Sequence, residues 1–217
     1  MRPLPRLLAF SDDRIAALDD FGIRAAAIVA VGPAVALVAR LPAANTDTLA
    51  TFAQRCVALA RPPEASVFVT GRADVALAVG ASGVILRTGD LTIADVRSAI
   101  GAARGLFVLR SIHADEEAEL AISEGADGLI VGSIWESASH PGRAGAGLAL
   151  LERVARRGVP TFAIGGVTAQ RAADARDAGA WGVAAIAALW DAADSYAAAR
   201  AMLAPWQDVE PGAAPCN

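Results

Sequence analysis

A histidine stands where one apolar run of the chain ends. Residues 106–110 precede Ser111, Ile112 and His113. An imidazole at the carboxyl end of a strand can take up and return a proton near neutral pH. Ser111 lies two residues before His113, so an extended chain turns both to the same side. We expect the pair to address one ligand; a surface histidine beside a helix start is the alternative.

A double glycine ends another apolar run. Residues 160–164 lead into Gly165 and Gly166, and a helix is expected after Thr168. Glycines let an anion approach backbone N–H groups, and a helix N-terminus adds partial positive charge. Barrels often bind phosphate between the loops after strands seven and eight. The partner segment would contain Ala185 and Ile186, so these residues form the predicted phosphate site.

Two more segments offer groups to an anionic ligand. Arg40 closes the apolar run 34–40, where it is either a ligand contact or a side chain reaching solvent from a strand end. The segment 133–145 contains Ser137 and Arg143 and is long enough to cover a site. We expect Ser137 to contact the ligand; a solvated loop has the same composition.

The composition restricts the class of protein. The 217 residues carry a formal net charge of −4, and the scattered arginines do not form the basic stripe of a nucleic-acid-binding protein. No uninterrupted apolar run has the length of a membrane span. Cys56 and Cys216 lack metal-ligand spacing, so we expect no metal and no cofactor. The first residues do not resemble a signal peptide, and a cytoplasmic location is expected.

Short apolar runs alternate with helical periods along the chain, and the length suits one α/β domain. The expected strands are 7–10, 34–40, 66–70, 83–86, 106–110, 128–132, 160–164 and 182–186. The expected helices are 14–31, 46–60, 74–79, 93–103, 115–124, 147–156, 169–178 and 192–203. Eight such units fit a doubly wound sheet or a closed barrel.

Three recurring fragments favour the barrel: 80–84, 125–129 and 179–183. In each, a glycine ends a helix in the left-handed conformation and a strand begins at once. Such tight turns belong at the amino ends of the strands, which leaves the longer loops for the functional face. We therefore predict a single (β/α)₈ TIM barrel over residues 1–204 and a disordered tail over residues 205–217.

The motifs, taken in order, resemble the thiamine phosphate synthase/TenI superfamily. The matching segments are 8–12, 71–77, 80–86, 110–113, 125–128 and 163–166. The resemblance covers residues 7–203. It implies a TIM barrel that acts on a phosphorylated thiazole.

The synthase branch is matched in part. Its members join a pyrimidine pyrophosphate to a thiazole phosphate with magnesium. Arg40 alone matches Gln-x-Arg-x-Lys, Thr70-Gly71 replaces Asn-Asp, and only Asp90 remains of His-Leu-Gly-Gln-x-Asp. His140 stands where the branch has a lysine. One carboxylate is a poor platform for magnesium.

The TenI branch is matched better, by residues 70–74, 110–113 and 135–137. Its members are thiazole tautomerases, which aromatise a thiazole carboxylate phosphate by moving a proton. The resemblance implies that His113 carries this proton, and Arg40 is our candidate for the substrate carboxylate. We expect a tautomerase that needs no metal.

Three alternatives stay open. In the first, the chain is a divergent magnesium-dependent synthase that uses Asp90. In the second, it is a non-catalytic regulatory barrel that binds a thiazole or thiamine phosphate. In the third, it is an unrelated isomerase. Self-association is also open, because Trp181, Trp190 and Trp206 fit either a contact between copies or core packing.

Overall fold

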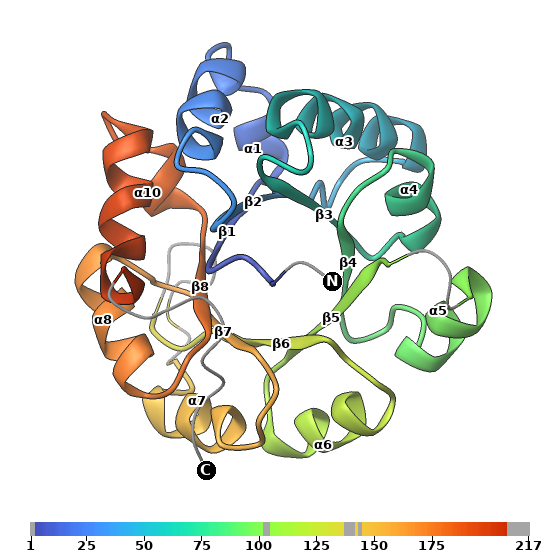
Figure 1. The fold of residues 1–217 in the computed structure, drawn as a ribbon, viewed down its shortest axis with the longest axis vertical. Helices are drawn as coiled ribbons and strands as arrows, with labels where there is room; N and C mark the ends of the chain where they lie inside the picture. The colour runs from blue at the N-terminus through green and yellow to red at the C-terminus, as the bar shows by residue number, and fades with distance from the viewer. Residues whose placement is uncertain (1–2, 102–104, 137–141, 143–144, 208–217) are drawn as a thin grey trace.

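A computed structural model describes residues 3–101, 105–136, 142 and 145–207. Eight parallel strands form a closed barrel in chain order, with helices around it (Figure 1). The strands are β1 (Leu7–Phe10), β2 (Val35–Ala39), β3 (Ser66–Thr70), β4 (Gly83–Leu86), β5 (Phe107–Ile112), β6 (Gly128–Gly132), β7 (Thr161–Ile164) and β8 (Gly182–Ala185). The predicted (β/α)₈ TIM barrel is confirmed.

The outer layer consists mainly of α-helices. They are α1 (Asp13–Ala16), α2 (Phe21–Val29), α3 (Thr46–Ala60), α4 (Ala73–Ala78), α5 (Ile93–Ile100), α6 (Asp115–Ser123), α7 (Leu148–Ala155), α8 (Ala169–Asp177), α9 (Ala187–Trp190) and α10 (Ser195–Leu203). In the described part of the chain, none of these helices is long and apolar enough to span a membrane.

The expected helix over 14–31 is wrong in one respect, because the structure divides it into α1 and α2. The side chain of Asp12 accepts a hydrogen bond from the Ile15 amide and caps the short α1. The chain then turns before α2 begins at Phe21, whose ring is buried. Asp12 and Asp20 are therefore helix-start residues, and the apolar periodicity that continues past α1 hides the break.

Regular structure continues past the predicted end of the barrel at residue 204. Ala204–Trp206 form a 3₁₀ helix, and the indole Nε1 of the buried Trp206 donates to the Ala180 carbonyl at 3.3 Å. The start of the predicted disordered tail therefore packs on the barrel. Residues 208–217 of that tail lie outside the described residues.

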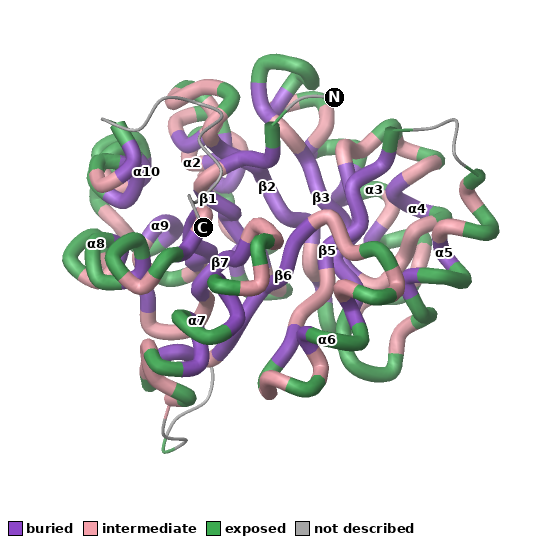
Figure 2. The backbone as a smooth tube through the Cα atoms, turned by 60° about the horizontal axis from the view of Figure 1, so that its bottom comes forward, coloured by how far each residue is buried: buried purple, intermediate pink, exposed green. Residues whose placement is uncertain are grey.

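Alternation along the strands divides the core into two layers. One set of side chains fills the barrel, and the other packs the strands against the helices; Figure 2 shows the strands buried along their length. The inner set is Leu8, Phe10, Ala36, Val38, Phe68, Ile85, Phe107, Leu109, Ile130, Phe162 and Ala184.

The three recurring fragments adopt the predicted turn. Gly80, Gly125 and Gly179 have φ of +70°, +88° and +88°. In each fragment the next amide donates back to the last helical turn, as Ala81 does to the Ala76 carbonyl at 2.9 Å. These turns lead directly into the amino ends of β4, β6 and β8.

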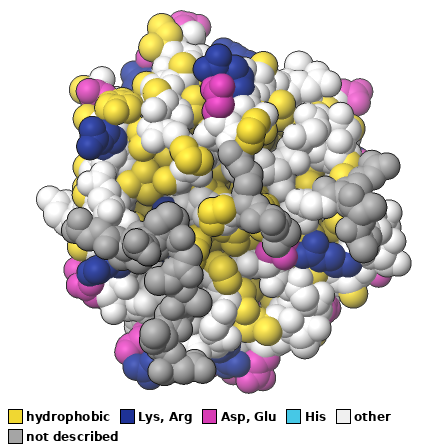
Figure 3. Space-filling view, in the orientation of Figure 1, with side chains coloured by type: hydrophobic (Ala, Val, Ile, Leu, Met, Phe, Trp, Pro, Cys, Tyr) yellow, Lys and Arg dark blue, Asp and Glu magenta, His cyan; other side chains and the backbone are white. Residues whose placement is uncertain are grey.

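The first described residues close this amino-terminal end. They cross the centre of the ring in Figure 1, and Leu4 is buried with the inner set. The Arg6 guanidinium stacks on the Trp181 ring, 3.5 Å from its centroid. Hydrophobic side chains show through the middle of this face in Figure 3. Ligand access is therefore expected at the opposite rim.

A substitution at Gly182 tests the packing at the point where β8 meets the chain before β1. A Cβ there would lie 2.1 Å from the Arg6 carbonyl oxygen, which accepts the Val183 amide. We expect Gly182→Ala to lower the free energy of unfolding by about 1–3 kcal/mol in urea denaturation. Gly22→Ala is the control, because its nearest neighbour is an arginine atom at 3.7 Å and alanine favours the helix. Equal stability of the two variants would contradict this packing.

Candidate functional site

Two arginines lie at the barrel rim on the two sides of β3. Arg40 comes directly after β2, and Arg87 comes directly after β4. Both continue the alternation of inner residues, since Val38 and Ile85 fill the barrel two residues earlier. The structure therefore directs two cations toward the mouth at the carboxyl ends of the strands.

Arg40 is half-buried, and its guanidinium has no hydrogen bond or ion pair within the described part of the chain. Burial lowers the pKa of Arg40, and the nearby positive charge of Arg87 lowers it further, while Asp12 and Asp13 act in the opposite direction. A guanidinium that loses water beside a like charge is stabilised by an anion.

Arg87 is held by Asp90. The carboxylate of Asp90 accepts from the Arg87 backbone N–H at 2.7 Å and from Nε and Nη2 at 3.2 Å. The pair packs against Gly71, where a Cβ would lie 3.1 Å from Arg87 Nη2 and 3.2 Å from an Asp90 oxygen. The absence of a side chain at position 71 therefore makes room for the ion pair.

Ser11 fixes the backbone of Arg40. Its buried hydroxyl accepts from the Arg40 amide at 3.0 Å and can donate to the Val38 carbonyl at 3.0 Å or to the Arg40 carbonyl at 3.1 Å. The Ser11 amide also donates to the Val38 carbonyl at 3.0 Å. The end of β1 thus sets the position at which the Arg40 side chain leaves β2.

His113 lies just beyond β5 and is exposed. Its Nδ1 contacts the Gly132 carbonyl oxygen at the end of β6, and its backbone N–H donates to the Glu117 carboxylate at 2.6 Å. A carbonyl can only accept, so Nδ1 carries a hydrogen and the neutral ring keeps Nε2 as its basic nitrogen. The geometry is compatible with proton transfer at Nε2.

The structure does not bring Arg40 and His113 into contact. The charged neighbours of Arg40 are Arg87, Asp12 and Asp13, whereas the described partners of His113 lie on β6 and α6. Ser111 lies on β5, two residues after the inner Leu109, and its contact with a ligand stays a prediction. Ser137 and His140 lie outside the described residues.

Gly165 and Gly166 have φ of +94° and +65°. A Cβ on Gly165 would lie 2.5 Å from the Ser133 Cβ, and one on Gly166 would lie 2.4 Å from the Glu136 carbonyl oxygen. The loop after β6 therefore packs directly on the double glycine. Arg171 of α8 donates to the Gly166 carbonyl at 2.6 Å, which fixes that peptide.

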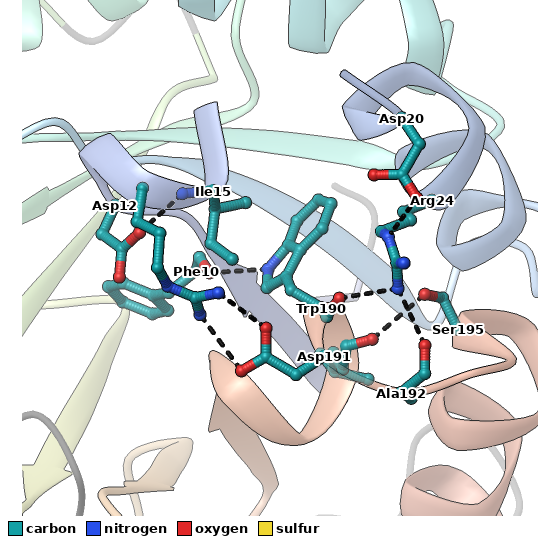
Figure 4. Close-up of polar contacts among 11 residues, drawn as sticks. Phe10, Asp12, Ile15, Asp20, Arg24, Trp190, Asp191, Ala192 and Ser195 are labelled. Atoms are coloured by element: carbon teal, nitrogen blue, oxygen red, sulfur yellow. Dashed lines mark hydrogen bonds and ion pairs between the residues drawn. The ribbon is translucent and has the colours of Figure 1, made fainter. Parts of the chain in front are cut away.

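The segment after β8 is anchored to the first two helices (Figure 4). Ala185 ends β8, and Ile186 precedes α9. Trp190 Nε1 donates to the Phe10 carbonyl at 2.8 Å, and Arg24 donates to the carbonyls of Trp190 and Ala192, both at 2.8 Å. These bonds fix the predicted partner of the double glycine; phosphate binding there stays a prediction.

An ion pair completes this anchor. Arg14 of α1 contacts Asp191 at 2.7 Å and 3.1 Å through its two terminal nitrogens. Both side chains are about half exposed, so the pair contributes little to stability. Its consequence is geometric, because β1, α1 and α9 meet at one side of the rim.

Sequence reasoning did not select Arg87 or Ser11 as site residues. The signal for Arg87 was present, since it follows the apolar run 83–86 as Arg40 follows its own. Ser11 gave no such signal, because its role depends on the pairing of β1 with β2. In the described residues, no three His, Cys, Asp or Glu side chains group to hold a metal.

The fold and the rim define an α/β barrel suited to a small anionic ligand. The thiamine monophosphate synthase family model matches residues 8–189, and the chain belongs to this family. Thiamine-phosphate synthase of Thermus thermophilus is 37% identical over 169 residues, which cover 76% of this chain and 80% of that protein.

Two further proteins are similar. Thiamine-phosphate synthase of Mycolicibacterium gilvum is 40% identical over 158 residues, or 72% of this chain and 64% of that protein. A solved thiamine phosphate pyrophosphorylase from Pyrococcus furiosus superposes with a TM-score of 0.78 at 29% identity, covering 95% of this chain and 97% of that one. The resemblance inferred from the motifs is confirmed.

A substitution at Ser11 tests whether its hydroxyl holds the backbone of Arg40 in place. We expect Ser11→Ala to lower the free energy of unfolding by about 1–3 kcal/mol, because the Arg40 amide loses its acceptor. The same variant should bind inorganic pyrophosphate more weakly in calorimetry. Ser123→Ala is the control, since the Ser123 hydroxyl bonds only within α6, to Leu120. Unchanged pyrophosphate affinity would limit Ser11 to a structural role.

Proposed function

We propose that this protein is a transferase of the thiamine-phosphate-synthase type, which joins a pyrimidine pyrophosphate to a thiazole phosphate. The observation that carries the proposal is the half-buried Arg40 guanidinium at the rim, where burial and the nearby positive charge of Arg87 favour an anion. The curated relatives named thiamine-phosphate synthase support this alternative over the tautomerase expected from the motifs.

In this reaction the residues at the rim must stabilise a leaving diphosphate. A C–N bond forms between the thiazole nitrogen and the pyrimidine methylene carbon, and the C–O bond to the diphosphate breaks. The diphosphate leaves with the electron pair and gains negative charge. Two guanidiniums are suited to that charge, because each has N–H donors in one plane.

The thiazole phosphate needs a second anion site. Gly165 and Gly166 and the segment at Ile186 are our candidates, because both segments follow neighbouring strands at the rim where barrels often bind phosphate. Arg171 holds the Gly166 carbonyl and so fixes the direction of the peptides around it. The two anion sites would then hold the two substrates at different parts of one mouth.

The residues present do not fit the magnesium that the synthase branch uses. Thr70 and Gly71 provide no carboxylate, and both oxygens of Asp90 accept hydrogen bonds from Arg87. The 217 residues also contain no lysine. The charge of the leaving group therefore falls to arginine in this proposal.

The tautomerase is the second candidate, favoured by one observation. The contact of His113 Nδ1 with the Gly132 carbonyl leaves Nε2 as a base at the rim. This activity would need His113 and would not need Arg87. The two candidates therefore predict different variants to be inactive.

A two-substrate assay tests the proposal. Purified protein is incubated with the pyrimidine pyrophosphate and thiazole phosphate, and thiamine phosphate is measured as fluorescent thiochrome. We expect turnover by the wild type, a loss of about 100-fold in kcat/KM for Arg40→Ala, and little change for His113→Ala. Arg176→Ala is the matched control, because Arg176 is a surface arginine of α8 paired with Asp177.

The same variants are assayed by ultraviolet absorbance with the non-aromatic thiazole carboxylate phosphate. Aromatisation that is lost in His113→Ala, without any coupling activity, would replace the transferase by the tautomerase. Absence of both activities, with phosphate-ester binding retained, would favour a non-catalytic binding barrel.

A further inference from the structure

The Arg87–Asp90 pair occupies space that a metal site would need. The Asp90 side chain is only 14% exposed, and its oxygens accept three hydrogen bonds from Arg87. A carboxylate must turn free oxygen lone pairs toward a magnesium ion, and the ion keeps near-octahedral geometry. Binding magnesium here would break the ion pair and leave the Arg87 guanidinium beside a divalent cation.

Position 71 provides no second carboxylate and leaves little room for one. Gly71 has φ of +72°, and a Cβ there would lie 3.1–3.3 Å from Arg87 and from both Asp90 oxygens. The neighbouring acidic side chain on α4, Asp74, is paired with Arg72, whose hydrogen bonds hold the pKa of Asp74 below its usual range. The carboxylates nearest in sequence to β3 and β4 are thus already neutralised by arginines.

Arg40 supplies the other half of the site. Within the described residues its guanidinium has no partner, and it is close enough to Arg87 for the charges to repel. The two strands that carry these arginines flank β3, so the side chains enter the mouth from one sector of the barrel. A diphosphate offers oxygens on two phosphorus atoms; Arg40 presents its whole planar fork of donors to them, and Arg87 presents the N–H groups that Asp90 leaves free.

We propose that Arg40 and Arg87 bind the diphosphate group of the substrate directly, without a divalent metal, and that Asp90 is the partner of Arg87 and not a metal ligand. The inference rests on the proposed transferase for its substrate, but the diphosphate site stands on the two arginines. Arg87 takes the electrostatic role that a metal ion would have, and Arg40 adds the second positive charge of the site.

Calorimetry with inorganic pyrophosphate tests the proposal on the full chain. The titrations are made in EDTA and again in excess magnesium, at equal ionic strength. We expect binding in EDTA, and no tighter binding in magnesium, because a magnesium-bound pyrophosphate carries less negative charge for the arginines. Arg40→Ala and Arg87→Ala should each weaken binding in EDTA by roughly tenfold or more.

Two further variants complete the test. Arg176→Ala should bind as the wild type does, since its guanidinium lies on the surface of α8. Asp90→Asn removes the carboxylate charge. Adding magnesium should change the pyrophosphate affinity of this variant by the same factor as that of the wild type. Thermal unfolding of every variant shows whether a loss of binding reflects a loss of the fold.

Two results would overturn the inference. The first is pyrophosphate binding that needs magnesium, or is at least tenfold tighter with it, and loses this dependence in Asp90→Asn. The second is no binding under either condition. A failed coupling assay together with metal-free binding through both arginines would refute the transferase and leave the diphosphate site standing.

Discussion

The pairing of β1 with β8 is the constraint on which the site depends. Leu7 aligns with Val183, and this register closes eight parallel strands so that all of them end at one rim. The amino-terminal end is packed by Leu4 and by the Arg6–Trp181 stack. Side chains that lie at the strand ends therefore share one mouth, although they are distant in the sequence.

The end of β1 links the two halves of that mouth. Ser11 holds the backbone at Arg40, and the Phe10 carbonyl receives the Trp190 indole from α9. Arg14, three residues further, contacts Asp191. One short segment thus sets the position of a cation on one side and of the predicted phosphate loop on the other. Figure 4 shows the second side, where Trp190 donates to Phe10.

The barrel was readable from the sequence because its signals are local. Apolar runs mark the strands, and the glycines at 80, 125 and 179 mark turns that need a residue in the left-handed backbone conformation. The site was readable only in part. Arg40 was found as a charge that closes an apolar strand. The packing of the Arg87–Asp90 pair on Gly71 could not be found in this way, because it depends on where β3 and β4 meet.

The central claim is that two arginines, and not a metal, hold the diphosphate. A crystal structure of the protein grown in EDTA with inorganic pyrophosphate tests it most directly. The account predicts pyrophosphate within hydrogen-bonding distance of both the Arg40 and Arg87 guanidiniums, with the Arg87–Asp90 pair intact. Pyrophosphate bound elsewhere, or a structure grown in magnesium in which Asp90 has left Arg87 to ligate the ion, would contradict it.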